Sequence, residues 1–142
     1  MGKVISMNHD CDQHLRLRLP RHPRSVARAR EALWGLMSAP GDRDLPGDLG
    51  DTAALLLSEL VTNALRHGSP PGREIVVTVH RADGLLRLEV EDAGDSLPRP
   101  RTPDPIDECG RGLALVAALA DDWGVAPRQG PGKRVWVTLK AP

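Results

Sequence analysis

The chain carries the sequence ELVTNALRH at residues 59–67, late in an apolar helical run. Glu59 and Asn63 are four positions apart, so a helix places them on one face, one turn from each other. The opposite face carries an apolar stripe typical of a helix that packs on a core, namely Leu57, Leu60, Val61, Ala64 and Leu65. A carboxylate beside an amide oxygen on a rigid helix suits a hard cation such as Mg²⁺. On these residues alone a solvated polar face is the simpler interpretation, because Thr62 and Arg66 lie there too.

Two later segments place glycines beside a charged residue, Asp92 in one and Arg111 in the other. The strand-like run LLRLEVED ends in Asp92-Ala93-Gly94, and CGRGLALVAAL opens an apolar helix with Gly110-Arg111-Gly112. The N–H groups and the dipole of a helix N-terminus favour a phosphate, and an arginine adds a positive charge. Taken separately, each segment also fits an ordinary turn or a glycine-rich loop before a buried helix. The sequence contains no Gly-x₄-Gly-Lys-Ser/Thr pattern, which excludes a P-loop NTPase.

The order of these three segments resembles the N, G1 and G2 boxes of the GHKL ATPase superfamily, which has the Bergerat nucleotide-binding fold. Within that superfamily the chain is similar to the small anti-sigma-factor serine/threonine kinases and to related actinobacterial regulatory ATP-binding proteins. The resemblance covers residues 15–140, nearly the whole chain. It implies that the cofactors are ATP and Mg²⁺.

The resemblance also implies a role for each residue of the first box. Glu59 matches the general base that prepares a hydroxyl for phosphoryl transfer, and Asn63 matches the Mg²⁺ ligand. His67 matches a position that is often histidine in these kinases, and it is therefore a candidate nucleotide-binding residue. A cation placed against the dipole at a helix C-terminus is an equally good account of His67.

The two glycine boxes would bind the adenine base and the phosphates of the nucleotide. Asp92 matches the residue that accepts a hydrogen bond from the exocyclic amine of adenine, and Gly94 matches the glycine that lets the backbone approach the ring. The second glycine box corresponds to Gly110, Arg111, Gly112 and Leu113.

The chain departs from the family's pattern in two places. Ser96 replaces the second glycine of Asp-x-Gly-x-Gly, which puts the nucleotide affinity and the lid conformation in question. In the closing strand Gly132 matches, whereas Lys133 and Arg134 stand where hydroxyl residues are usual. For Lys133, a contact with phosphate and a simple exposed lysine at a strand edge are both open, and the exposed lysine is the simpler account.

Hydrophobic periodicity predicts an α/β fold, a two-layer sandwich of a mixed, mostly antiparallel sheet with helices on one face. This is also the Bergerat, or histidine-kinase-like ATPase, fold that the resemblance implies. Strands are expected at residues 14–20, 75–81, 85–92, 123–129 and 133–140, and helices at residues 26–37, 48–67 and 111–120. Ser25 is a candidate N-cap of the first helix, and Asp48 or Asp51 of the second. Residues 95–109 contain four prolines and are expected to form a loop or lid.

Length and composition limit the remaining possibilities. With 142 residues we expect a flexible N-terminus at residues 1–13 and a single GHKL-type ATP-binding domain at residues 14–142. The 19 basic and 19 acidic residues balance, so neither nucleic acid nor an anionic membrane is an expected partner. No run reaches transmembrane length and no signal peptide is evident, so a cytoplasmic protein is expected.

The leading functional prediction is an ATP-binding anti-sigma factor that is also a serine/threonine protein kinase. The resemblance implies as partners a sigma factor, a STAS-type anti-sigma-factor antagonist that would be phosphorylated, and a second copy of the chain. One alternative is a nucleotide-gated protein-binding module without effective kinase activity. Another is a detached histidine-kinase ATPase domain, which would need a phospho-acceptor on another protein, because His9, His14 and His22 lie in non-helical contexts.

Overall fold

The computed structural model describes seven parts of the chain: residues 3–8, 12–38, 47–68, 73–82, 84–94, 108–128 and 130–141. Side chains are described for residues 13–38, 48–66, 73–82, 84–94, 114–128 and 130–141. Ser96 and most of the expected proline-rich lid lie outside the described residues.

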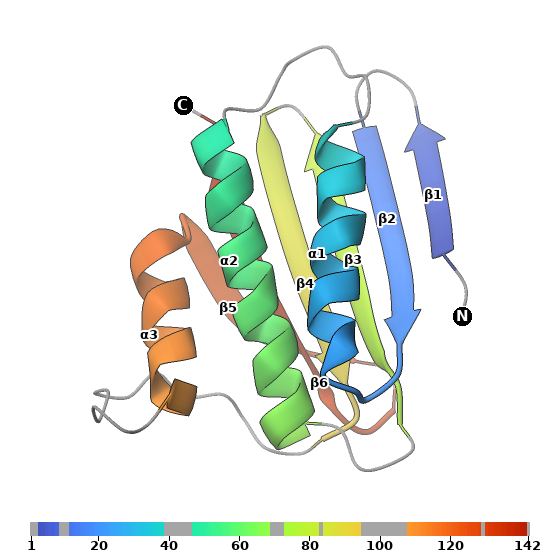
Figure 1. Cartoon of the computed structure of the whole chain (residues 1–142), viewed down its shortest axis with the longest axis vertical. Coiled ribbons are helices and arrows are strands. Elements are labelled where there is room, and N and C mark those ends of the chain that lie inside the picture. The colour runs from blue at the N-terminus through green and yellow to red at the C-terminus, as the bar shows by residue number, and fades with distance from the viewer. Residues whose placement is uncertain are drawn as a thin grey trace.

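The architecture is a six-stranded sheet with the strand order β1-β2-β3-β4-β6-β5, covered on one face by helices (Figure 1). The strands are β1 (Lys3–Asn8), β2 (Asp12–Leu19), β3 (Ile75–Ala82), β4 (Leu85–Asp92), β5 (Asp122–Pro127) and β6 (Lys133–Lys140). The helices are α1 (Arg24–Met37), α2 (Gly47–Asn63) and α3 (Glu108–Leu119). The predicted two-layer α/β sandwich is confirmed, with every described strand pairing antiparallel rather than mixed.

The central hairpin forms where period-two alternation predicts it. Ala82 pairs with Leu85, which leaves two residues for the turn, and Gly84 adopts a φ of 75° that suits a glycine in a tight hairpin. Both strands send alternate side chains into the core: Ile75, Val77, Val79, Leu86, Leu88 and Val90.

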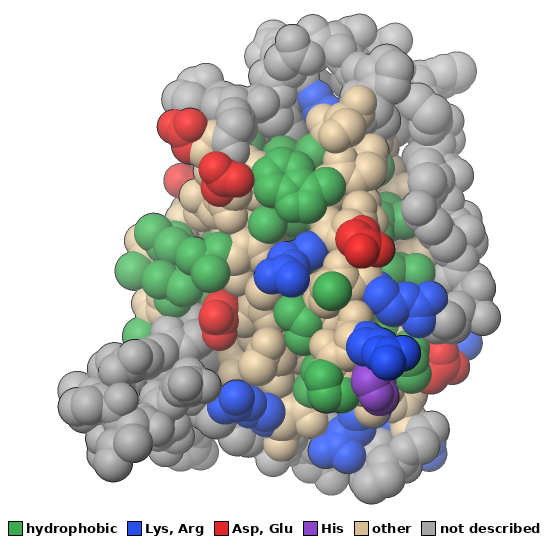
Figure 2. All heavy atoms as spheres, viewed as in Figure 1, with side chains coloured by type: hydrophobic (Ala, Val, Ile, Leu, Met, Phe, Trp, Pro, Cys, Tyr) green, Lys and Arg blue, Asp and Glu red, His purple; other side chains and the backbone are tan. Residues whose placement is uncertain are grey.

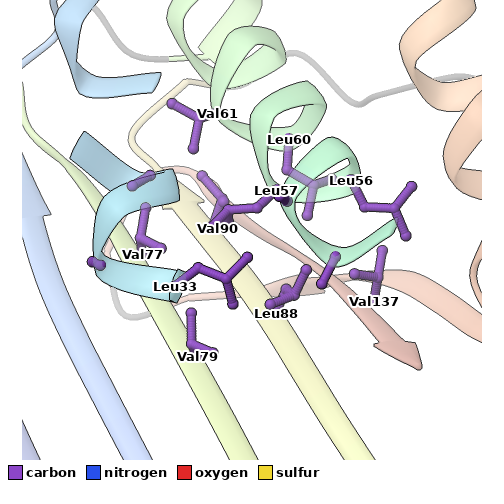
Figure 3. Close-up of a cluster of buried hydrophobic side chains, with 14 of the residues drawn as sticks. Leu33, Leu56, Leu57, Leu60, Val61, Val77, Val79, Leu88, Val90 and Val137 are labelled. Atoms are coloured by element: carbon purple, nitrogen blue, oxygen red, sulfur yellow. The ribbon is translucent and has the colours of Figure 1, made fainter. Parts of the chain in front are cut away.

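The hydrophobic core lies between the sheet and the helices. Figure 3 shows Leu33 of α1 and Leu57 of α2 among the valines and leucines of β3 and β4. Both leucines are 0% exposed. Burying a side chain of this size stabilises the fold by about 1.5–3 kcal/mol relative to leaving it in water. The core therefore fixes α1 and α2 against the centre of the sheet, and it fixes with them the polar side chains that α2 carries.

The N-terminal residues are more ordered than the sequence predicts. Lys3–Asn8 form β1 at the edge of the sheet and pair with β2, and Asp12 and Gln13 belong to β2 itself. The expectation that residues 1–13 are a flexible segment without regular structure is therefore wrong for this part of the chain. The physical reason is that an edge strand is stabilised by backbone hydrogen bonds to its neighbour, and these bonds do not require an alternating side-chain pattern in the sequence.

The expected helix caps are also wrong. Pro23 occupies the N-cap of α1, and Ser25 lies inside the first turn, where its buried hydroxyl donates a hydrogen bond to the Pro20 carbonyl at 2.6 Å. Helix α2 begins at Gly47, so Asp48 and Asp51 both lie within the helix. Asp48 remains in the first turn, where a negative charge stabilises the helix dipole.

Helix α2 changes its winding just after Asn63. The next five residues form a π-helical turn, η1 (Ala64–Gly68), which packs against β4. Short π-helical segments inside α-helices occur frequently at functional sites. Here the change begins directly after the residue that the sequence assigns to Mg²⁺.

Candidate functional site

Several of the predicted site segments meet at one end of the molecule. In Figure 1 the C-terminal end of α2, the end of β4, the start of β6 and the start of α3 all lie at the lower end of the view. Asp92 is the last residue of β4, and Asn63 is the last residue of α2. Chain segments far apart in sequence thus bring the three motifs to a common region.

The helical part of the site follows the predicted spacing. Glu59 and Asn63 both lie on α2 and are partly exposed, whereas Leu57, Leu60 and Val61 behind them are buried. The hydroxyls of neighbouring Ser58 and Thr62 donate hydrogen bonds to carbonyls one turn earlier, Ala54 and Ser58 respectively, at 2.7 Å each. These hydroxyls are thus directed to the helix backbone, and Glu59 and Asn63 remain as the acidic and amide groups of this face.

Asn63 carries a buried polar atom that none of the described residues satisfies. Among the described residues no hydrogen-bond partner contacts its Nδ2. Buried amide groups are nearly always hydrogen-bonded, so an unsatisfied one calls for an explanation, such as a missing ligand or water. The amide can also rotate to present its oxygen, a ligand type that Mg²⁺ accepts. The residues at this point therefore fit a hydrated cation or a ligand group.

The carboxylate of Asp92, which is predicted to contact the adenine base, is deeply buried. Asp92 is 2% exposed, and its Oδ1 accepts a hydrogen bond from the backbone N–H of Gly94 at 2.8 Å. Gly132 adopts a φ of 114°, and a Cβ built on it would lie 1.9 Å from the Asp92 carbonyl oxygen. Only glycine can bring the turn before β6 this close to the end of β4. Gly132 thus sets the backbone position of Asp92.

Lys133 is not an exposed strand-edge lysine, and that prediction is wrong. It is 6% exposed, and its Nζ lies 3.1 Å from Asp92 Oδ1 in a buried ion pair. The reason lies in the sheet: β6 runs between β4 and β5, so it is an interior strand. The register places Lys133 directly opposite Asp92, and both side chains point to the helix-covered face.

Arg134 points to the opposite face of the sheet from its neighbour. Its side chain is 36% exposed and lies 4.0 Å from Glu89 and 3.9 Å from Glu91 on β4. Exposed ion pairs at such distances contribute little to stability. Of the two basic residues that replace the usual hydroxyls, only Lys133 therefore reaches the predicted base site.

The helix that contains the second glycine box begins about one turn earlier than predicted, so the box lies inside the helix. Helix α3 starts at Glu108, so Gly110 lies in the first turn, where N–H groups lack intrahelical acceptors. Gly112 and Leu113 lie beyond that turn. The side chains of Arg111 and Leu113 lie outside the described residues, as does that of His67 in η1.

The ion pair of Asp92 and Lys133 is the feature that sequence reasoning missed. Its signal was present, because Lys133 occupies the inward phase of a strand whose other inward residues are Val135, Val137 and Leu139. A charged residue at such a position requires a buried partner.

Among the described residues, no cluster of three His, Cys, Asp or Glu side chains suits a metal ion. No helix of this part of the chain has the length and hydropathy to cross a membrane.

Similarity to known families points in the same direction as this geometry. Residues 19–139 match the family of histidine kinase-like ATPase domains. The sensor protein DivL of Caulobacter vibrioides is 36% identical over 103 residues, which cover 66% of this chain and 13% of DivL. The histidine protein kinase DivJ of the same organism is 30% identical over 121 residues, covering 70% of this chain and 19% of DivJ.

The sensor histidine kinase DcuS of Escherichia coli is 36% identical over 96 residues, covering 57% of this chain and 17% of DcuS. The chain thus spans less than a fifth of the length of these curated relatives.

Solved structures share the fold. The blue-light activated histidine kinase of Erythrobacter litoralis EL346 superposes with a TM-score of 0.55 at 24% identity, over 82% of this chain and 40% of that chain. A structure of its histidine kinase domain gives a TM-score of 0.50 at 25% identity, over 86% of this chain and 61% of that chain.

Proposed function

Because this chain belongs to the family of histidine kinase-like ATPase domains, we propose that it binds ATP with Mg²⁺ and transfers the γ-phosphate to a serine or threonine of a partner protein. The observation that carries the proposal is the placement of Glu59 and Asn63 one turn apart on the polar face of α2, at the end of the molecule where β4 places Asp92. This arrangement offers a carboxylate, a cation ligand and a base-site acceptor within one region.

Each group has a distinct task in this proposal. Asn63 would hold Mg²⁺, with the remaining ligands supplied by water and phosphate oxygens, as is usual for this ion. Asp92 would contact the purine, and the first turn of α3 would contribute backbone N–H groups to the phosphates. Glu59 would accept the proton of the attacking hydroxyl. Phosphoryl transfer depends mostly on positioning and charge stabilisation, so the general base adds to a rate acceleration that the rest of the site already provides.

The proposed partners are a sigma factor, held inactive, and a STAS-type antagonist that receives the phosphate, with a homodimer as the proposed assembly. A protein-binding role is supported by large hydrophobic side chains that remain exposed on all three helices: Trp34 at 40%, Leu55 at 43% and Leu119 at 42%. Figure 2 shows hydrophobic side chains lying between charged ones on this helix-covered face. These side chains give the helix-covered face apolar surface that a partner protein would bury on binding.

A second candidate is phosphotransfer to histidine, favoured by the histidine kinases among the relatives. In that case the acceptor would lie outside the described side chains of this chain. His14 lies on β2 with its ring 5.9 Å from that of His80, and His22 precedes α1 and accepts a hydrogen bond from the Arg24 N–H. Neither of these two histidines is presented on a helix.

The deciding experiment is a phosphotransfer assay from radiolabelled ATP to candidate antagonist proteins, with the wild type and Glu59→Gln. Glutamine keeps the size of the side chain but removes the base, and a positioned base contributes about 10²–10⁴-fold to rate. We expect Glu59→Gln to bind ATP and partner normally and to transfer phosphate at least about a hundredfold more slowly. Glu31→Gln, an exposed change on α1, is the matched control and should transfer at the wild-type rate.

The chemical stability of the product separates the candidate functions. A phosphate on serine or threonine survives acid treatment, whereas a phosphate on histidine is lost, which would favour the second candidate. A wild type that binds ATP and partner but transfers no phosphate would identify a nucleotide-gated binding module. Equal rates of phosphate transfer by Glu59→Gln and by the wild type would show that Glu59 is not the general base.

A further inference from the structure

The carboxylate of Asp92 is shared between the predicted base site and a lysine. Lys133 Nζ and the Gly94 N–H both contact the same oxygen, Oδ1, at 3.1 Å and 2.8 Å. The two side chains are 2% exposed for Asp92 and 8% for Lys133, so water and salt screen the pair only weakly. The positive charge therefore compensates the carboxylate at the point where a purine edge would meet it.

A bare buried carboxylate discriminates strongly between the two common substituents at purine position 6. A 6-amino group donates a hydrogen bond to the carboxylate, whereas a 6-oxo group presents only lone pairs and is repelled. An ammonium beside the carboxylate changes both interactions. It weakens the attraction for the 6-amino group. It also offers N–H donors to a 6-oxo group, because an ammonium has three donors and the contact with Asp92 Oδ1 uses one.

The pair is fixed by the sheet rather than by a loop. Asp92 and Lys133 are directly opposed in the β4–β6 register, and Gly132 packs its backbone against Asp92. Lys133 also lies on the same inward face as Val135, which is 7% exposed. Solvent is thus a poor alternative for the ammonium, and a bound base would meet the lysine together with the carboxylate.

We propose that Lys133 is a base-selectivity determinant: its buried pairing with Asp92 lowers the preference of the site for 6-amino over 6-oxo purine nucleoside triphosphates. This inference rests on the proposed nucleotide site, and it adds the ligand class that the site accepts. Lys133 thereby has a direct role in recognition of the purine. The sequence had suggested a contact with phosphate or an exposed position instead.

The test compares the dissociation constants of ATP and ITP by calorimetry in the presence of Mg²⁺. ITP differs from ATP only at position 6 and in the adjoining N1 proton, so the ratio of the two constants reports on the Asp92 edge. We expect the wild-type ratio to lie within about tenfold. Lys133→Met should raise the preference for ATP at least about tenfold above the wild-type value, the effect of one charge-assisted hydrogen bond.

Three further variants make the test specific. Lys133→Arg retains the charge and should keep the ratio near that of wild type. Lys133→Gln retains a hydrogen-bond donor to Asp92 without the charge, so it gives a folded neutral variant if Lys133→Met unfolds, and it should raise the ratio at least about threefold. Lys140→Met removes the same charge from the exposed far end of β6 and should leave the ratio unchanged.

Two results would overturn the inference. One is an equal ratio in wild type and in folded neutral variants of Lys133, and the other is a wild type that already prefers ATP more than about a hundredfold. A different result would contradict the proposed function itself, namely no binding of either nucleotide at millimolar concentration by any folded protein in the series.

Discussion

The helical and strand parts of the candidate site are built on different physical grounds. Glu59 and Asn63 are neighbours because one helix turn places them so, and their relation survives any change elsewhere that leaves α2 intact. Asp92 and Lys133 are 41 residues apart and meet only because β4 and β6 pair in one register. The strand part should therefore be coupled to global stability, whereas the helical part should tolerate substitution and lose only function.

The sharpest way to test this contrast is Gly132→Ala. A Cβ at this position would overlap the Asp92 carbonyl oxygen, and φ is 114°, so clash and backbone strain act together. We expect a loss of about 4 kcal/mol or more in the free energy of unfolding, measured by urea denaturation. Gly130→Ala is the matched control, because Gly130 also has a positive φ, of 81°, but a Cβ there meets no atom of the described residues within 4 Å.

The control should lose only about 1–2 kcal/mol, the strain of the left-handed backbone alone. Similar losses for both variants would mean that the approach of Gly132 to Asp92 does not matter for stability.

The next largest effect is expected for the charge of Lys133. Lys133→Met leaves the Asp92 carboxylate buried without its ionic partner, so it should lower the free energy of unfolding by about 3 kcal/mol. The double variant Asp92→Asn/Lys133→Met removes both charges and should recover most of this loss in thermal or chemical denaturation. If the double variant is less stable than Lys133→Met by a further large amount, the ion pair is not the source of the effect.

The smallest stability effect is expected in the helical part. Asn63→Ala removes an amide whose Nδ2 has no partner among the described residues, so the unfolding free energy should change by less than about 1 kcal/mol. The Mg²⁺ dependence of ATP binding should nevertheless disappear, which calorimetry with and without the ion measures. Thr62→Ala, one residue earlier on the same helix, should retain that dependence. A variant at Asn63 that still binds ATP in a Mg²⁺-dependent way would place the cation elsewhere.

Much of the fold could be predicted because the sequence patterns are local. The alternation at Ile75, Val77 and Val79 predicted a strand, and the apolar stripe of α2 predicted its buried face. Strand β1 escaped prediction because its sequence, KVISMN, has no strict apolar and polar alternation, whereas its pairing with β2 is made by backbone hydrogen bonds. The prediction of a cap at Ser25 failed because its hydroxyl donates a hydrogen bond to the Pro20 carbonyl, five residues earlier in the chain, instead of accepting one from its own helix.

The sequence by itself determined the features that depend on fixed backbone spacing. These are the placement of Glu59 beside Asn63, the hairpin at Gly84 and the two-layer α/β class. Only the tertiary structure decided which residue stands opposite Asp92, because register and strand order depend on how the whole sheet assembles. The same assembly made β6 an interior strand, and it thereby turned Lys133 from an expected surface residue into the buried partner of the base-site carboxylate.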